Sequence, residues 1–260
     1  MRLTDSKVVI TGAAKGIGKA IAKRFAKEGA IISIFDVDQA NASLVVDEIV
    51  NDGGIAYSIQ CDVGDSYQVD NAFTEAISKM GGLDVLVNNA GIIRQSLVVD
   101  MLEEEWDSII RTNLKSVFLC TKRALKEMIP ANKGGRIIAI SSIHSQLSEP
   151  SCSHYTASKG GIESFIRTVA SEAAPYKITA NFIRPGATFT ELTASMYTDS
   201  VKRSLFERIP LRKIADADSV AQAALFLASD DSGYMTGQDI TIDGGYLMNG
   251  SLPGAQYWID

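Results

Sequence analysis

Residues 7–20, KVVITGAAKGIGKA, place three glycines between a run of β-branched residues and a segment whose apolar residues have helical spacing. Gly12, Gly16 and Gly18 allow the main chain to turn tightly and to approach a pyrophosphate, whose charge the N-terminus of the next helix stabilises. A glycine cluster alone is weak evidence. This one follows a strand and opens a helix, and therefore predicts a nucleotide-binding unit. The candidate phosphate-binding residues of the turn are Gly12, Lys15, Gly16, Ile17 and Gly18.

The alternation of strand and helix continues along the whole chain. Short β-branched runs alternate with longer segments whose apolar residues recur at helical spacing, and this order predicts a parallel sheet covered on both faces. We therefore predict a single α/β domain with a Rossmann-type, doubly wound, seven-stranded sheet. Residues 1–100 would mainly bind the cofactor and residues 101–260 would form the catalytic half. The predicted strands lie within 7–12, 30–36, 55–62, 83–91, 135–142, 178–186 and 239–245.

Composition excludes several classes of function. The net charge of −6 and the sequence pI near 5.1 provide no basic field for nucleic acid or an anionic membrane. The N-terminal residues have no secretory pattern, and no apolar run approaches the roughly 18 residues of a membrane span. Three separated cysteines, Cys61, Cys120 and Cys152, suit reduced thiols in the cytoplasm, and two histidines are too few for a His-rich metal centre.

Acidic residues end the second and third predicted strands. Asp36 can accept hydrogen bonds from the adenosine ribose and repel a 2′-phosphate, which predicts NAD rather than NADP, although Lys15 could partly offset that repulsion. Asp62 ends the third strand and could meet the adenine, with Val63 beside it. Asp65 is a candidate helix cap, which shows how common acids are in such loops.

The stretch 154-HYTASKG-160 places a tyrosine and a lysine on one face of a helix, because positions i and i+4 are neighbours there. The ammonium of Lys159 would lower the pKa of Tyr155 and make its phenol usable as an acid or base. For this pair alone, a surface tyrosine beside a solvated lysine is the simpler interpretation. The rest of the chain decides between the two.

Several ordered motifs together resemble the short-chain dehydrogenase/reductase family over nearly the whole chain. They are Thr11-Gly12-x-x-x-Gly16-x-Gly18, NNAG at 88–91, Asn113, Ser142, Tyr155-x-x-x-Lys159 and PGATFT at 185–190. The resemblance implies that Tyr155 exchanges a proton with substrate during hydride transfer, and that Lys159 binds the nicotinamide ribose. It implies that Ser142 hydrogen-bonds the substrate oxygen and that Asn113 holds a water linking Lys159 to solvent.

The same resemblance implies further cofactor contacts. NNAG would support the central sheet beneath the adenine ribose, with Asn89 nearest the cofactor and Gly91 beside it. Pro185 and Gly186 would end the sixth strand at the nicotinamide, and Thr188 and Thr190 would bind its carboxamide and the phosphates. Many relatives have Ile or Val at the position of Thr188 and an acid at the position of Phe189.

Within the family, the chain is most similar to sugar dehydrogenases of the glucose 1-dehydrogenase group, but NNAGIIR at 88–94 resembles gluconate and deoxygluconate dehydrogenases. A guanidinium in this loop can pair with a carboxylate or sulfonate, so Arg94 is the leading anion-binding candidate. Arg184 is a second candidate, although a structural ion pair explains it equally well. His144 should point near the substrate, and His154 adjoins Tyr155 without a required role in proton transfer.

These inferences predict NAD-dependent oxidation of an anionic aldose, such as a uronate or sulfoquinovose, at C1 to the lactone. The alternatives are a dehydrogenase acting at C3 or C5 of a sugar acid, a neutral glucose-type 1-dehydrogenase and a 3-oxoacyl reductase. A non-catalytic NAD-binding sensor on the same fold is a further alternative. Residues 188–216 would form a helical lid that decides among the substrates.

Two further expectations concern assembly and the chain end. The family commonly forms tetramers, which implies a homotetramer through residues 101–129 and 154–174. The C-terminal tail, residues 246–260, is apolar enough to fold over a substrate pocket of its own subunit or a neighbour's. Docking for stability alone is the alternative.

Overall fold

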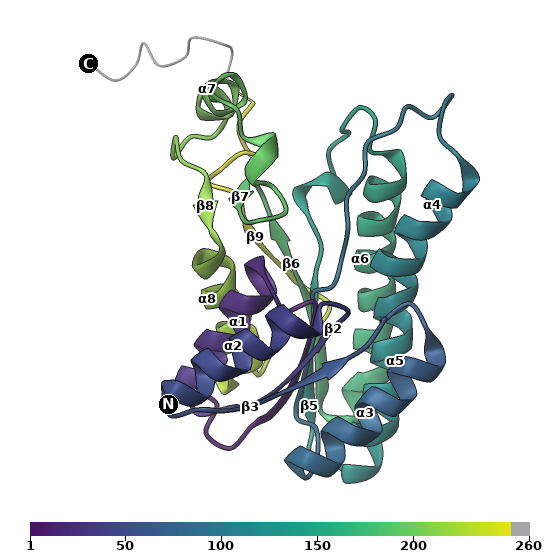
Figure 1. Cartoon of the computed structure of the whole chain (residues 1–260), viewed down its shortest axis with the longest axis vertical. Coiled ribbons are helices and arrows are strands. Elements are labelled where there is room, and N and C mark those ends of the chain that lie inside the picture. Colours follow the sequence, from purple (N-terminus) through teal and green to yellow (C-terminus); the bar gives the residue numbers. More distant parts are fainter. Residues whose placement is uncertain (251–260) are drawn as a thin grey trace.

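A computed structural model describes residues 1–250 and shows one α/β domain built on seven parallel strands (Figure 1). The strand order is β3-β2-β1-β4-β5-β6-β9, and each predicted strand is present. The sequence-based prediction of a seven-stranded, doubly wound sheet is therefore confirmed. The strands are β1 (Lys7–Thr11), β2 (Ile31–Asp36), β3 (Ile55–Gln60), β4 (Val85–Asn88), β5 (Gly135–Ile140), β6 (Ile178–Pro185) and β9 (Asp239–Ile242).

Helices cover both faces of the sheet (Figure 1). One face packs against α1 (Gly16–Lys27), α2 (Gln39–Asn51) and α8 (Ala217–Ala228). The other packs against α3 (Ser66–Met80), α5 (Ser116–Ala131) and α6 (Ser153–Ala173), with α4 (Glu103–Ile109) leading into α5. Apolar residues on both sides of each inner strand are therefore buried, which explains why these strands read as continuous apolar runs.

Strand β1 illustrates how one short run serves two layers. Val8 and Ile10 enter the core beneath α1 and α8, whereas Val9 between them enters the core beneath α3 and α5, and all three are fully buried. Successive side chains of a strand point to opposite faces, so both layers are anchored by three consecutive residues. The chain leaves β1 towards β2 and later returns to β4 on the other side of β1. This reversal of strand order is where open α/β sheets bind ligands.

Segment 188–216 rises beyond the carboxyl ends of the strands, where α7, β7 and β8 lie in Figure 1. It contains the paired short strands β7 (Thr188–Phe189) and β8 (Ala215–Asp216), a 3₁₀ turn at Ala194–Met196 and α7 (Asp199–Arg208). The predicted lid is thus helical chiefly in α7. Of the predicted tail, 246–260, the structure describes residues 246–250, which follow β9. The rest of the tail lies outside the described residues.

Other structural features bear on the excluded functions. Asp65 caps α3 by accepting hydrogen bonds from the amides of Tyr67 and Gln68, as predicted. Cys61, Cys120 and Cys152 are buried free thiols, and burial raises the pKa of each; for Cys61 it reaches about 12. Within residues 1–250, no helix is long and apolar enough to cross a bilayer, and no three His, Cys, Asp or Glu side chains gather as a metal ion would require.

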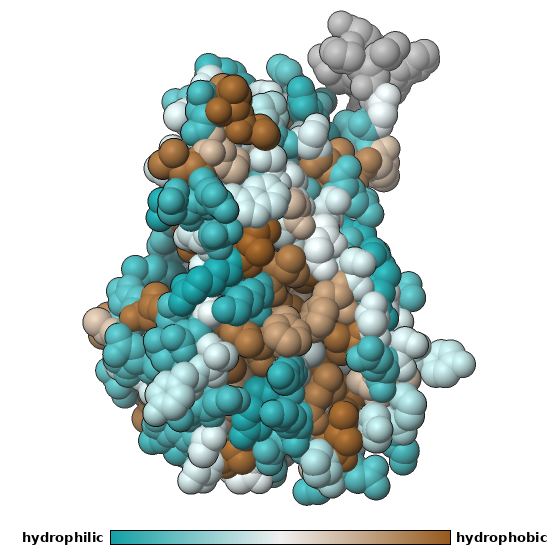
Figure 2. Space-filling view, turned by 90° about the vertical axis from the view of Figure 1, so that its right-hand side faces the viewer, coloured by the Kyte–Doolittle hydropathy of each residue, from teal (hydrophilic) through white to brown (hydrophobic). Residues whose placement is uncertain are grey.

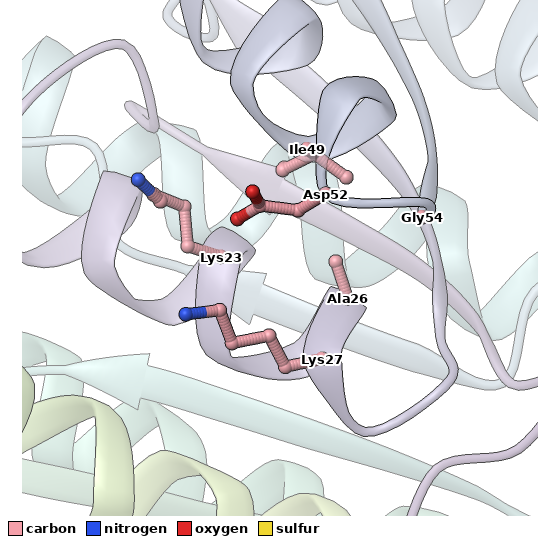
Figure 3. A pocket seen from close by; sticks show the side chains of 6 residues that line it. All are labelled: Lys23, Ala26, Lys27, Ile49, Asp52 and Gly54. Atoms are coloured by element: carbon pink, nitrogen blue, oxygen red, sulfur yellow. The ribbon is translucent and has the colours of Figure 1, made fainter.

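A small cavity between α1 and α2 lies next to the amino end of β3, away from the carboxyl ends of the strands (Figure 3). Its volume is about 20 Å³, which holds little more than one water molecule. The ammonium groups of Lys23 and Lys27 extend away from Ala26 and Gly54. This cavity therefore offers no substrate site.

Candidate active site

The glycine turn is held against the end of β4 by the NNAG segment. Thr11 accepts hydrogen bonds from the amides of Asn89 (3.0 Å) and Ala90 (3.1 Å), and the Asn89 side chain donates to the carbonyls of Thr11 (3.0 Å) and Gly12 (2.7 Å). Gly12 has a φ of 65°, and a Cβ there would lie 2.7 Å from Ala90 Cα. The turn therefore requires glycine for both conformation and contact. Asn89 is brought to the turn, as its predicted position implies.

The rest of the turn opens α1 in the predicted manner. Gly16 is the first residue of α1 and has a φ of 57°. A Cβ on Gly18 would overlap the main-chain oxygen of Gly12 and approach the Asn89 amide to 2.5 Å. Ile17 is partly buried against the core. The glycines of the turn therefore place no side chain of their own between the main chain at this helix N-terminus and an anion.

Asp36 ends β2 beside the turn. Its carboxylate accepts hydrogen bonds from the amides of Ala14 (2.9 Å) and Asp38 (2.9 Å). Lys15 forms an ion pair with Asp38 (2.9 Å), and that hydrogen bond lowers the pKa of Asp38 to about 2. Lys15 is thus paired with a second carboxylate that the sequence analysis had not considered. Two acids, Asp36 and Asp38, therefore lie beside the glycine turn.

Asp62 follows β3 and is engaged by a residue that the sequence analysis did not single out. Its carboxylate pairs with Arg111 (2.6 Å) and accepts from the amide of Gly64 (2.9 Å). Burial alone would raise the pKa of Asp62, but the hydrogen bonds from Arg111 and Gly64 and the charges of Arg111 and Lys115 together outweigh it, and the pKa is lowered. Val63 is buried beside it. The indication that the sequence offered for Arg111 is its position two residues before Asn113, a predicted site residue.

Ser142 and Tyr155 meet where β5 ends and α6 begins. Ser142 is buried and hydrogen-bonds the Tyr155 phenol, while its hydroxyl also accepts from the amide of His144 (3.2 Å). Burial raises the pKa of Tyr155 to about 12, and the Ser142 hydrogen bond opposes this rise only in part. Tyr155 is therefore protonated at neutral pH and oriented by Ser142.

Lys159 lies beside Tyr155 but does not lower the pKa of the phenol in this structure. Its ammonium lies 5.5 Å from the Tyr155 ring centroid and donates to the carbonyl of Ile140 (2.8 Å). Burial lowers the pKa of Lys159 to about 8. The expectation of a tyrosine pKa moved towards neutrality is thus wrong here, because loss of water acts on both groups and the ammonium is directed elsewhere.

Asn113 lies in a π-helical turn, Ile110–Lys115, between α4 and α5. Its side chain accepts from the amide of Ile92 (2.8 Å) and donates to the carbonyl of Ile92 (2.9 Å) and to Ser158 (3.2 Å). A Cβ on Gly91 would lie 3.4 Å from Asn113 Oδ1 and 3.7 Å from Lys159 Nζ. The structure therefore brings together the predicted catalytic set of Asn113, Ser142, Tyr155 and Lys159. The predicted water held by Asn113 stays a prediction.

Arg94 and His144 lie at the same edge. The loop of Arg94 is fixed by Asn113 at Ile92 and by contacts with the residues before α6: Cys152 Sγ lies 3.8 Å from the Arg94 carbonyl. Arg94 is exposed and has no carboxylate within ion-pair distance in residues 1–250. The ring of His144 lies edge-on to Tyr155 with centroids 6.5 Å apart, and burial lowers its pKa. Its Nδ1 is buried without a hydrogen-bond partner in residues 1–250.

Arg184 is not a substrate-binding residue, contrary to its place among the candidates. It is 5% exposed and pairs through two nitrogens with Glu163 (2.7 Å each), and its third nitrogen reaches Asp239 (2.6 Å). Ser141 also donates to Glu163 (2.9 Å). Arg184 points from β6 towards α6, on the same side as Phe182, and so anchors the helix that carries Tyr155.

The end of β6 brings the last predicted cofactor residues over the glycine turn. The amide of Gly186 donates to the carbonyl of Ile242 (2.9 Å), and this hydrogen bond ties Pro185 and Gly186 to β9. Thr188 is buried, and a Cβ on Gly16 would lie 3.3 Å from the Thr190 side chain. Glu191, which is not among the predicted site residues, follows directly and contacts this turn.

Comparison with known proteins identifies one family. Residues 12–247 match the family model described as Enoyl-(acyl carrier protein) reductase. The chain is similar to the 3-oxoacyl-[acyl-carrier-protein] reductase FabG of Staphylococcus aureus, with 38% identity over 249 residues that cover 95% of this chain and all of that one.

Solved structures share the whole fold. A short-chain dehydrogenase/reductase of Mycobacterium marinum has a TM-score of 0.90 and 35% identity, covering 95% of this chain and 97% of its own. A putative gluconate dehydrogenase of Agrobacterium tumefaciens has a TM-score of 0.91 and 32% identity, covering 96% and 98%. A 7α-hydroxysteroid dehydrogenase, solved with NADH and 7-oxo glycochenodeoxycholic acid, has a TM-score of 0.91 and 33% identity, covering 94% and 95%.

Replacing Glu163 with Gln should lower the free energy of unfolding by about 3 kcal/mol at pH 7, because Arg184 loses its buried counter-ion. Glu172→Gln, at an exposed position of the same helix, should change it by less than about 0.5 kcal/mol. Burial alone would raise the pKa of Glu163, but the hydrogen bonds from Arg184, Ser145 and Ser141 and the charge of Arg184 together outweigh it and lower the pKa. Its contribution is therefore present above the unfolded pKa of about 4.3 and is lost as the pH falls further. Urea denaturation from pH 7 to pH 3 measures both; a constant difference across this range would contradict the ion-pair explanation.

Proposed function

The chain belongs to the short-chain dehydrogenase/reductase family, and we propose that it transfers a hydride between NAD(H) and a secondary alcohol or the corresponding carbonyl. The observation that carries this proposal is the meeting of Ser142, Tyr155 and Lys159 at the strand edge, next to a glycine turn able to receive a pyrophosphate. The nicotinamide ring supplies or accepts the hydride when bound. Residues 1–100 then serve mainly the cofactor, and later residues serve the chemistry.

The protonation states suit a proton exchange at the substrate oxygen. Tyr155, with a pKa of about 12, holds its proton and can give it to a carbonyl that is being reduced. In the oxidative direction the phenol must first lose this proton, and of the groups around it Ser142 favours that loss. Lys159, with a pKa of about 8, loses its charge in alkaline solution. Ser142 also hydrogen-bonds the substrate oxygen in this scheme.

The acids after β2 support NAD over NADP. Asp36 accepts hydrogen bonds from two main-chain amides. Asp38 forms an ion pair with the ammonium of Lys15, the cation that could otherwise have paired with a 2′-phosphate. A 2′-phosphate would face both carboxylates without a free local cation in this turn. The glycine turn and Asp36 suit a nicotinamide dinucleotide, and in this proposal Thr188 and Thr190 contact its nicotinamide half.

For the substrate, we propose an anionic sugar, such as a uronate or a sulfosugar, oxidised at C1 to the lactone. Arg94 is an exposed guanidinium without an acidic partner among the described residues, on a loop fixed next to the residues that precede Tyr155. His144 presents a buried ring nitrogen without a partner in the same range, beside the catalytic phenol, and can bind a sugar hydroxyl. The likeness to a putative gluconate dehydrogenase supports the same substrate class.

A second candidate is reduction of a 3-oxoacyl thioester. The 38% identity with a 3-oxoacyl-[acyl-carrier-protein] reductase over its whole length favours it, and the comparisons support this alternative better than they support sugar oxidation. Both reactions use the same catalytic set. They differ in what Arg94 and segment 188–216 must hold: a small anionic polyol or an acyl chain.

For assembly, we propose a homotetramer in the cytoplasm. Apolar side chains gather on the face formed by α5 and α6 (Figure 2), around a groove of about 460 Å³ whose lining includes Phe118, Leu125, Ile129 and Phe165. Phe118 is 43% exposed although it is large and apolar. An apolar face of this kind supports subunit packing.

Phe118→Glu should reduce the mass in solution from four times the chain mass of 27.9 kDa to a smaller species, because a buried unpaired charge disfavours an interface. Light scattering coupled to size exclusion measures this mass. Tyr176→Phe, at an exposed position elsewhere, is the control. A monomeric wild-type protein would overturn the proposed assembly.

Tyr155→Phe should reduce turnover by roughly 10²- to 10⁴-fold, because the acid or base is removed. The dissociation constant for NADH should change little, since the ring remains in place. Stopped-flow kinetics and NADH fluorescence titration separate the two effects, and NADPH is titrated in parallel. Undiminished turnover would remove Tyr155 from the reaction, and tighter binding of NADPH than of NADH would overturn the choice of NAD.

Arg94→Ala should lower kcat/KM for the acidic sugar by roughly 10- to 100-fold, the effect of losing one charge-assisted pair. Glucose, glucuronate, galacturonate, gluconate and sulfoquinovose are tested with NAD, and a 3-oxoacyl thioester with NADH. Lys133→Ala, at an exposed lysine between α5 and β5 that does not line the groove proposed for subunit packing, is the control. Turnover of neutral sugars that the Arg94 variant leaves unchanged would make Arg94 structural. Turnover of the thioester alone would establish the second candidate.

A further inference from the structure

The side chain of Glu191 is hydrogen-bonded to the first main-chain amide of α1. Its carboxylate Oε2 accepts a hydrogen bond of 3.0 Å from the amide of Gly16, although the two residues are 175 positions apart. The charge of Glu191 also contributes to the raised pKa of Lys15, whose principal cause is the hydrogen bond to Asp38. The contact therefore places a third carboxylate beside the glycine turn, together with Asp36 and Asp38.

This carboxylate lies at a helix N-terminus, the kind of position at which proteins bind phosphate groups. The first amides of a helix have no partners within the helix, and they point outwards with the positive end of the helix dipole. A carboxylate satisfies the Gly16 amide with the same charge sign and hydrogen-bond role as a phosphate oxygen. Both groups cannot accept from this amide at the same time with good geometry.

Segment 188–197 is folded on itself in a way that fixes Glu191 there. The Thr193 hydroxyl accepts from the amide of Thr190 (3.0 Å) and donates to the carbonyl of Thr188 (2.7 Å). Tyr197 donates to the same carbonyl (3.3 Å) and stacks on Phe189 with ring centroids 6.3 Å apart. The Glu191 backbone is therefore held by its own loop, and only the side chain reaches α1.

Gly16 permits the approach. A Cβ there would lie 3.3 Å from two atoms of the Thr190 side chain and 3.8 Å from Glu191 Oε2. The segment after β6 thus packs directly on the glycine turn. Displacing Glu191 would uncover the Gly16 amide without unfolding α1.

We propose that Glu191 is an intramolecular competitor of the dinucleotide pyrophosphate and thereby sets the affinity of the cofactor site. The inference rests on the proposed binding of NAD(H). The observed affinity of a site is the intrinsic affinity multiplied by the fraction of open molecules, so a contact closed about nine-tenths of the time weakens binding about tenfold. Removing the carboxylate should strengthen dinucleotide binding, whereas the loss of an ordinary binding residue would weaken it.

The contact itself is tested without any ligand. Hydrogen exchange is followed by mass spectrometry on peptides that contain Gly16 in wild type, Glu191→Ala and Glu207→Ala. Glu207 is an exposed glutamate in the same lid segment, and no contact joins it to the glycine turn within the described residues. Faster exchange at Gly16 in Glu191→Ala alone supports the contact. Equal exchange in all three proteins overturns it, whatever the enzyme catalyses.

The competition is tested by titrating the same three proteins with NADH and following its fluorescence. Glu191→Ala should bind NADH about tenfold more tightly than wild type, and Glu207→Ala should match wild type. Equal or weaker binding by Glu191→Ala overturns the competitor role. Absence of NADH binding in all three proteins overturns the proposed function and the competition together, while the exchange experiment still reports separately on the contact.

Discussion

The clamp between the ends of β1 and β4 is the constraint on which the rest of the site depends. The Thr11 hydroxyl accepts hydrogen bonds from two main-chain amides of the NNAG segment, and the Asn89 side chain donates to the carbonyls of Thr11 and Gly12. These are the two strands between which the strand order reverses. Because this junction is closed by side-chain hydrogen bonds, the glycine turn, the loop of Arg94 and the π-helical turn of Asn113 all start from fixed positions.

A second anchor fixes the catalytic helix to the sheet. The buried pair of Arg184 and Glu163 joins β6 to α6, and Glu163 also receives the hydroxyl of Ser141, the neighbour of Ser142. Tyr155 and Lys159 lie on the same helix, about two turns and one turn before Glu163, respectively. A charge network beneath the site therefore sets the distance between the phenol on α6 and the serine after β5. The network makes no contact with substrate in this scheme.

The sequence was sufficient for the sheet and for the catalytic set, for a physical reason. Strands buried on both faces are apolar at most positions, so their runs stand out, and a glycine that cannot carry a Cβ, such as Gly12, is equally distinctive. Ion-pair partners leave no such mark. Nothing near Arg184 in the sequence identifies Glu163, and Lys15 gives no sign that Asp38 will take its charge. Whether Tyr155 lies in water or out of it also decides its pKa, and burial depends on the assembled fold.

The π-helical turn at Ile110–Lys115 carries a mechanical consequence. Successive residues of an α-helix are rotated by about 100° about the helix axis, and the wider π-helical turn changes this rotation locally. The buried side of α5 is therefore rotated relative to the buried side of α4, so the two helices do not share one continuous apolar stripe. Closing the turn by deleting one residue would regularise the helix but rotate Asn113 away from Ile92 or carry α5 out of register with α3 and α6. A regular α-helix through these six residues is thus incompatible with the observed position of Asn113, and the chain has the irregular helix.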